Sequence, residues 1–209
     1  MSTKIILSRH RLAFAGLITL GLIPVLAGGY RFAMLIEGSG AAENARFLRS
    51  PIPILIHLIS MLIIVPGGAY QLTQEVRLEQ RNRHRYLGFS MIVALYGVAT
   101  SGLWMTHFYE RVGFDGPFTT VFRWAAGLGT LACLFLGVRQ LFLAQYKSHG
   151  HWMMRSYALA MGAGTQVFTH IPFVIWPNWQ GQLGRALAMG AGWIINLIFV
   201  ESIIRRSQH

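Results

Sequence analysis

Charged residues and cysteine are both scarce in this chain of 209 residues. Charged side chains make up only 12% of the sequence, whereas hydrophobic residues make up 54%. A soluble globular domain usually carries about 25% charged residues, so the composition excludes a chain folded entirely in water. The single cysteine, Cys133, excludes an intrachain disulfide, a Cys-x-x-Cys redox pair, a covalently attached haem of the Cys-x-x-Cys-His type and a four-cysteine zinc site.

Acidic residues are the scarcer charged group, with 7 acidic against 18 basic residues. All of them fall in expected loops or near expected helix ends: Glu37, Glu43, Glu75, Glu79, Glu110, Asp115 and Glu201. A bilayer interior without a carboxylate disfavours a proton- or sodium-coupled transporter, which needs a titrating acid in its path. The paired carboxylates of glycoside hydrolysis are missing as well.

Long charge-free runs are abundant. About 20 apolar residues cross a bilayer as a helix, and runs that meet or approach this length predict helices near 12–36, 52–75, 85–108, 118–142, 151–176 and 184–204. The first run is longer than a signal-peptide core, so we expect it to stay in the protein as a helix. The sequence therefore predicts an all-α polytopic membrane protein, a bundle of six transmembrane helices in a single transmembrane domain covering 1–209.

Two local patterns concern the shape and packing of these helices. A proline and two glycines predict a kink in the second helix: Pro66, Gly67 and Gly68. Small residues at four-residue spacing in the fourth helix favour close packing against a neighbour: Ala125, Gly129, Cys133 and Gly137.

The basic residues predict the orientation. Most of them fall on one side of the six helices: Lys4, Arg9, Arg11, Arg77, Arg81, Arg83, Arg85, Arg139, Lys147, Arg155, Arg205 and Arg206. Basic residues in short loops mark the cytoplasmic side, so both termini are expected in the cytoplasm. The net charge of +11 is spread over segment ends instead of one basic face, which disfavours nucleic acid as a partner.

Histidines are the candidate functional groups inside the bilayer. His57 and His170 each lie about six residues from the outer end of their helix, roughly 9 Å deep. Two imidazoles at equal depth on antiparallel helices could hold a haem iron from both faces. Together with His107 they could instead bind a smaller metal ion.

A second pair of histidines is expected at the cytoplasmic side. His84 opens the third helix and His151 opens the fifth. Arg85 and Arg155 lie beside them and could neutralise haem propionates or a lipid headgroup, and the same site could instead bind a quinone ring. An ordinary role of these histidines in anchoring at the interface, or in hydrogen bonds between helices, stays open.

A resemblance adds to this interpretation. His57, the His84-Arg85 pair with Gly88, and the run His151-Trp152-Met153-Met154-Arg155-Ser156-Tyr157-Ala158-Leu159 resemble the pattern of an uncharacterised bacterial family of multi-helix membrane proteins. The resemblance covers roughly residues 50–170 and implies a multi-pass protein of the bacterial inner membrane, without an established activity. The layout is more loosely similar, at the level of the fold, to transmembrane di-haem cytochromes b.

The leading hypothesis from the sequence is an inner-membrane protein that binds haem b and transfers electrons. The expected ligands are His57 and His170, with His84 and His151 as a second pair. Such a protein would exchange electrons with quinol or a partner complex, as a component of a membrane oxidoreductase. Two alternatives are an accessory or scaffold subunit of a membrane complex, and a transporter of a metal ion or small lipophilic molecule.

Overall fold

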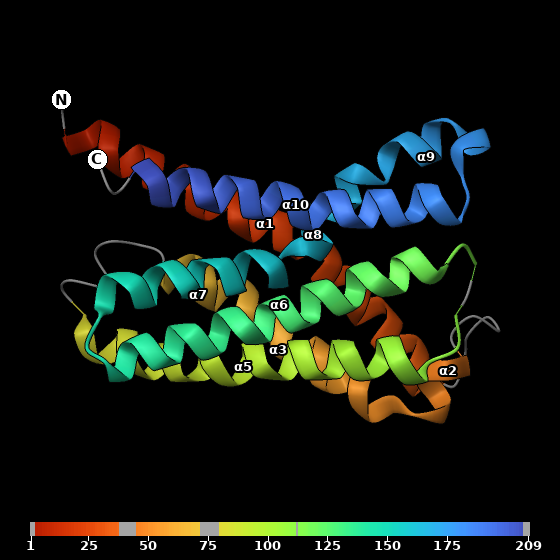
Figure 1. Cartoon of the computed structure of the whole chain (residues 1–209), viewed down its shortest axis with the longest axis horizontal. Helices are drawn as coiled ribbons and strands as arrows, with labels where there is room; N and C mark the ends of the chain where they lie inside the picture. Colours follow the sequence, from red (N-terminus) through yellow and green to blue (C-terminus); the bar gives the residue numbers. More distant parts are fainter. Residues whose placement is uncertain (1–2, 38–44, 72–79, 112, 207–209) are drawn as a thin grey trace.

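Long helices that run side by side form the protein (Figure 1). The structure is a computed structural model that describes residues 3–37, 45–71, 80–111 and 113–206. Within these residues there are helices and loops and no strand, which confirms the all-α prediction. In chain order the helices are α1 (Thr3–Ile36), α2 (Ala45–Arg49), α3 (Pro51–Gln71), α5 (Arg81–Phe108), α6 (Pro117–Phe142), α7 (Tyr146–Ala160), α8 (Gly162–Thr169), α9 (Ile171–Ile175), the 3₁₀ helix η2 (Pro177–Trp179) and α10 (Gln182–Arg206).

Several of these helices are long and apolar enough to cross a membrane. In the described part of the chain, α3, α5, α6 and α10 meet this condition singly, and the bent pair formed by α7 and Gly162–Ile175 makes a fifth segment. Helix α1 has a shorter apolar stretch, Ile18–Met34. Large apolar side chains such as Phe89, Phe135 and Ile198 are more than 60% exposed on the outside of the bundle. In a bilayer these side chains face lipid, which carries no penalty for apolar exposure.

The interior of the bundle is built from large apolar side chains and small residues. Ile64 of α3, Leu95 of α5 and Leu134 of α6 belong to one buried cluster with Tyr157 of α7. Between α6 and α7, a Cβ placed on Gly137 would lie 2.9 Å from the sulfur of Met153. The predicted small-residue stripe thus includes a glycine at a close approach of two helices, as membrane helices require in the absence of a hydrophobic drive.

The prediction of one helix over 151–176 is wrong. The chain forms α7, α8 and α9 instead, with breaks at Met161 and His170 and a bend of 45°. Pro172 explains the second break, because proline lacks the N–H that would bond to the carbonyl four residues earlier and its ring clashes with that carbonyl. The glycines of the first turn of α8 allow the first break, because they impose little conformational preference. His170 is the residue at which α8 ends.

Other helix boundaries differ from expectation by a turn or less, except at α1, which begins at Thr3. Helix α3 continues through Pro66 to Gln71, so Pro66 does not end it, and a predicted extension of this helix to 75 lies outside the described residues. At Gly68 the ring of Tyr157 fills the space that a Cβ would need. Gly68 therefore admits an aromatic side chain from α7.

Gly164 of α8 packs closely against Leu20 of α1, and its replacement should destabilise the bundle. A Cβ at this position would clash with the backbone oxygen of Leu20, which cannot move without shifting α1. We expect Gly164→Ala to lower the free energy of unfolding by about 2 kcal/mol, as overpacking does. Thermal unfolding in detergent measures this effect. Gly29→Ala on α1 is the control because nothing lies within 4 Å of its Cβ, and an equal loss in both variants would contradict the prediction.

Candidate functional site

A large cavity lies near the end of the bundle that carries α2 and the loop between α5 and α6 (Figure 1). Its volume is about 940 Å³, which falls within the range of cavities that bind cofactors and other small molecules. Helices α1, α3, α5, α6, α8 and α10 all contribute to the lining. Much of the lining is apolar, and the polar exceptions include His57, His170, Gln166 and five arginines, Arg31, Arg46, Arg111, Arg123 and Arg185. The structure therefore brings the two predicted outer histidines to the same cavity.

The hydrogen bonds of Ser101 define the protonation of His57. The Ser101 hydroxyl has one proton and lies 2.6 Å from the carbonyl oxygen of Gly97, to which it donates. Its oxygen is also 3.2 Å from Nδ1 of His57, so this oxygen accepts a hydrogen bond from Nδ1–H. The neutral imidazole consequently keeps its lone pair on Nε2.

His170 has the same arrangement with a backbone partner. Its Nδ1 is 2.7 Å from the carbonyl oxygen of Gln166, one turn earlier in α8. A carbonyl can only accept, so Nδ1 donates and Nε2 again carries the lone pair. Histidines that bind metals through one ring nitrogen usually donate from the other to a carbonyl or a similar acceptor. Both cavity histidines therefore have the tautomer and the support of metal ligands.

An ion-pair network closes one side of the cavity. Arg123 donates to both carboxylate oxygens of Asp115, at 2.9 and 3.2 Å, and Nε of Arg185 donates to the same carboxylate. The Asp115 side chain is only 2% exposed. Burial alone would raise the pKa of Asp115, but the hydrogen bonds and charges of Arg185 and Arg123 outweigh it and hold the pKa below its usual value. This network joins the loop after α5 to α6 and α10.

A second group of arginines surrounds Phe47 of α2. The guanidinium carbons of Arg46 and Arg31 lie 4.8 and 5.2 Å from the centre of the Phe47 ring. Nη1 of Arg46 donates to the backbone oxygen of Glu110 at 2.8 Å, while its Nε is buried without a partner. Burial lowers the pKa of Arg46, the charge of Asp115 opposes this shift, and the charges of Arg123 and Arg31 add to it.

His107 lies apart from the cavity. It is exposed near the end of α5, where its ring contacts Phe108 and Trp124 at centroid distances of 4.6 and 6.1 Å. Among the described residues, no three His, Cys, Asp or Glu side chains gather in a way that could hold a metal ion. The structure thus brings together His57 and His170 of the predicted outer set and leaves His107 outside.

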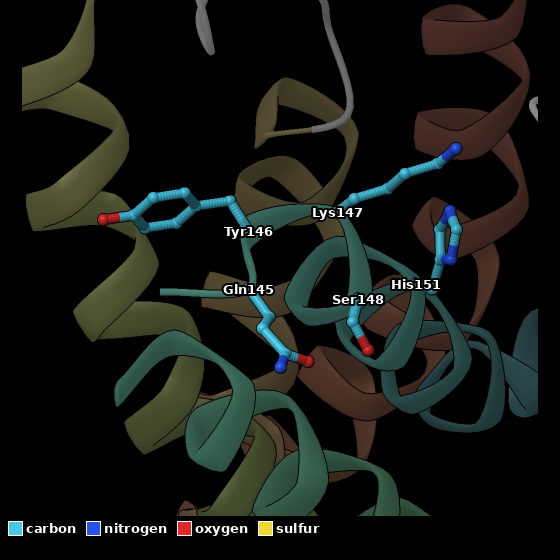
Figure 2. A pocket seen from close by; sticks show the side chains of 5 residues that line it. All are labelled: Gln145, Tyr146, Lys147, Ser148 and His151. Carbon is cyan, nitrogen blue, oxygen red and sulfur yellow. The ribbon is translucent and has the colours of Figure 1, made fainter. Parts of the chain in front are cut away.

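The predicted inner residues lie at the other end of the bundle. His151 lines a shallow pocket of about 600 Å³ at the start of α7, where its ring and the Lys147 side chain lie on one side of the helix and Tyr146 points the opposite way (Figure 2). Arg155 is already engaged, because it donates to both oxygens of Glu201 on α10 and stacks on Trp152. His84 contributes its backbone oxygen to a hydrogen bond from Gln71, and Arg85 is exposed.

In the sequence, Asp115 lies in an expected loop, and Arg123 and Arg185 lie near the starts of expected helices, where no local pattern assigned them a role. One signal was available: Asp115 is an acid in a short loop whose neighbourhood is otherwise rich in basic residues. Arg46 gave no such signal, because its burial follows from the packing of α2 beside α5. Gln166 was recognisable only through its spacing, four residues before His170 on a helix.

The long apolar helices and the large apolar side chains on the outside of the bundle define a polytopic helical membrane protein. Residues 54–204 match the model of the family described as "Predicted membrane protein (DUF2306)". This match covers most of the chain, and the protein belongs to that family. The sequence-based assignment to an uncharacterised multi-pass membrane family is therefore confirmed. No curated protein and no solved structure matches the chain.

Proposed function

We propose that the protein binds haem b in the cavity between α1, α3, α5, α6, α8 and α10, with His57 and His170 as the axial ligands. One observation carries this proposal. Both histidines line the same cavity, and each donates from Nδ1 to a fixed acceptor, so that Nε2 is the nitrogen with the lone pair. Nitrogen ligands of this kind from two helices are typical of transmembrane haem proteins.

The rest of the cavity matches the chemistry of such a cofactor. Haem b combines a flat apolar macrocycle with two carboxylates at one edge. The lining provides apolar side chains such as Leu58, Val98 and Leu159, and arginines are grouped around Phe47 and Asp115. The volume of about 940 Å³ leaves room for a ligand at the upper end of the size range of small-molecule sites.

A haem held by His57 and His170 would leave no position on its iron for a substrate and would supply one-electron transfer instead of chemistry on a bound substrate. A quinol from the bilayer or a partner complex would supply the electron. A second haem at His84 and His151 stays a prediction, with the difference that Arg155 is paired with Glu201.

The proposal includes the topology. The N-terminal end of α1 and the C-terminal end of α10 lie at the same end of the bundle (Figure 1). With α1 as a sixth membrane-spanning helix, the positive-inside rule orients this end to the cytoplasm. The haem cavity then lies toward the outer side of a bacterial inner membrane.

An absorption spectrum of the protein purified in mild detergent tests the proposal. We expect a Soret band, a sharp α band after reduction with dithionite, and about one haem b per chain at the outer site. Circular dichroism on the same sample reports whether the helices are intact. A helical sample that stays colourless, even after incubation with added haem b, would show that the proposal is wrong.

A further inference from the structure

Three of the five arginines at the cavity have no carboxylate partner in the described part of the chain, Arg31, Arg46 and Arg111, and the first two share one aromatic ring. Arg31 of α1 and Arg46 of α2 both lie over the buried ring of Phe47, with guanidinium carbons 5.2 and 4.8 Å from its centre. Like charges repel, and the repulsion is stronger where water is partly excluded. Two guanidinium groups on one ring therefore favour the binding of an anion beside them.

The side chain of Arg46 has a buried donor that needs an acceptor. Its Nε is buried and makes no hydrogen bond, whereas Nη1 is occupied by the backbone oxygen of Glu110. A charged donor buried without an acceptor costs free energy. Because Arg46 also lines the cavity, a ligand in the cavity is well placed to supply the acceptor.

Three other arginines of this region already have carboxylate partners. Arg123 and Arg185 share the buried carboxylate of Asp115. Arg49, one turn after Arg46 on α2, pairs with Glu110 in an exposed ion pair and does not line the cavity. Among the cavity arginines without a carboxylate partner, Arg46 has the buried donor without an acceptor, and Arg31 shares the Phe47 ring with it, so we assign the capacity for an anion to these two.

We propose that Arg31 and Arg46 bind the two propionate carboxylates of the haem, which orients the macrocycle with its carboxylate edge toward α2. This inference rests on the proposed function, because it assigns the cofactor's anionic edge within the same cavity. Arginine suits carboxylates through paired, charge-assisted hydrogen bonds. The phosphate of an anionic lipid has related chemistry and would satisfy the same arginines, so the experiment must separate these two sources.

The reduction potential of the haem measures the arrangement. Removal of a positive charge beside the cofactor favours the ferric form, which has one more positive charge than the ferrous form. We expect Arg31→Gln and Arg46→Gln each to lower the equilibrium constant for reduction of the haem about tenfold. For a one-electron couple this lowers the reduction potential by about 59 mV. Arg49→Gln is the matched control, because it removes the same charge from the same short helix at a position outside the cavity.

Haem dimethyl ester separates propionate binding from lipid binding. The ester keeps the macrocycle and blocks both carboxylates, so the protein purified without haem should bind it with equal affinity in the wild type and in Arg46→Gln. Haem b itself should bind about tenfold more weakly to Arg46→Gln than to the wild type, since a charge-assisted hydrogen bond is lost. Arg46→Lys, which keeps the charge, should recover part of the potential, and circular dichroism verifies folding of each variant.

The outcomes distinguish this inference from the function on which it rests. If the wild type binds haem but Arg31→Gln and Arg46→Gln change the potential no more than Arg49→Gln, the propionate assignment is wrong and the haem site stands. The assignment also fails if Arg46→Gln weakens haem b and its ester equally, because the arginine then acts on something other than the carboxylates. Absence of haem binding by the helical wild type overturns both.

Discussion

Replacement of His170 by glycine should convert a six-coordinate haem into one with a vacant axial position, and added imidazole should restore the original spectrum. The expected change follows from the geometry of this histidine, which lines the cavity and donates from Nδ1 to Gln166. Glycine removes the whole side chain, which leaves space for the added imidazole. We expect at least a hundredfold loss of haem affinity or complete loss during purification, and optical titration with haem b measures it.

His57→Ala should have an effect of the same size, because the two histidines have equivalent roles in the proposed site. Ser101→Ala tests the support of His57 and should weaken haem binding by about 10- to 100-fold, the usual range for a group that holds a metal-ligating histidine. His107→Ala is the control, since this exposed histidine lies at the same end of the bundle outside the cavity. A spectrum in His170→Gly identical to that of the wild type would contradict axial ligation by this residue.

The helices were predictable because each one follows from the residues of its own segment. A run of about 20 apolar residues has few ways to satisfy its backbone in lipid other than a helix, so α3, α5, α6 and α10 lie close to their expected bounds. The break of the fifth segment at His170 was also encoded locally, in Pro172, but the break at Met161 was not. A proline does not always break a helix, since Pro66 occurs inside α3 without ending it. Contacts with neighbouring helices decide between these outcomes.

The candidate site was predictable in part, for a similar reason. Equal depth along two helices placed His57 and His170 at the same level of the membrane, and the structure has both at one cavity. Depth alone does not define which way a side chain faces, so His107 was included although it lies outside. The roles of Asp115 and Arg46 depend on residues far away in the sequence, such as Arg185 and Arg31, and no local pattern reports such contacts.

Asp115→Asn should be among the most destabilising single polar substitutions in this protein. The Asp115 side chain is 2% exposed and accepts hydrogen bonds from Arg123 and Arg185, which belong to α6 and α10. Removal of one partner from a buried ion pair leaves the other charge without compensation, at a cost of 3–5 kcal/mol when both are buried. The two arginines are 27% and 36% exposed, so water compensates them in part and we expect a loss of about 3 kcal/mol. Chemical or thermal unfolding in detergent measures it.

The pH dependence of this loss identifies its origin. Because the ion pairs hold the pKa of Asp115 below its value in the unfolded chain, which is about 3.9, their contribution is complete above that value and disappears as the pH falls through the folded-state pKa. The difference in stability between the wild type and Asp115→Asn should therefore be constant between about pH 5 and pH 7 and should shrink below about pH 4.

Glu110→Gln supplies the matched control for both measurements. It removes a carboxylate from the same loop, but its ion pair with Arg49 is exposed, with side-chain exposures of 74% and 70%. An exposed pair contributes at most about 1 kcal/mol, and Glu110→Gln leaves intact the backbone oxygen that accepts from Arg46. A loss in Glu110→Gln as large as in Asp115→Asn would mean that the net charge of the loop, and not the buried network, stabilises this end of the bundle. A large loss confined to Asp115→Asn, and absent at low pH, would instead show that one carboxylate holds α6, α10 and the loop after α5 together around the cavity.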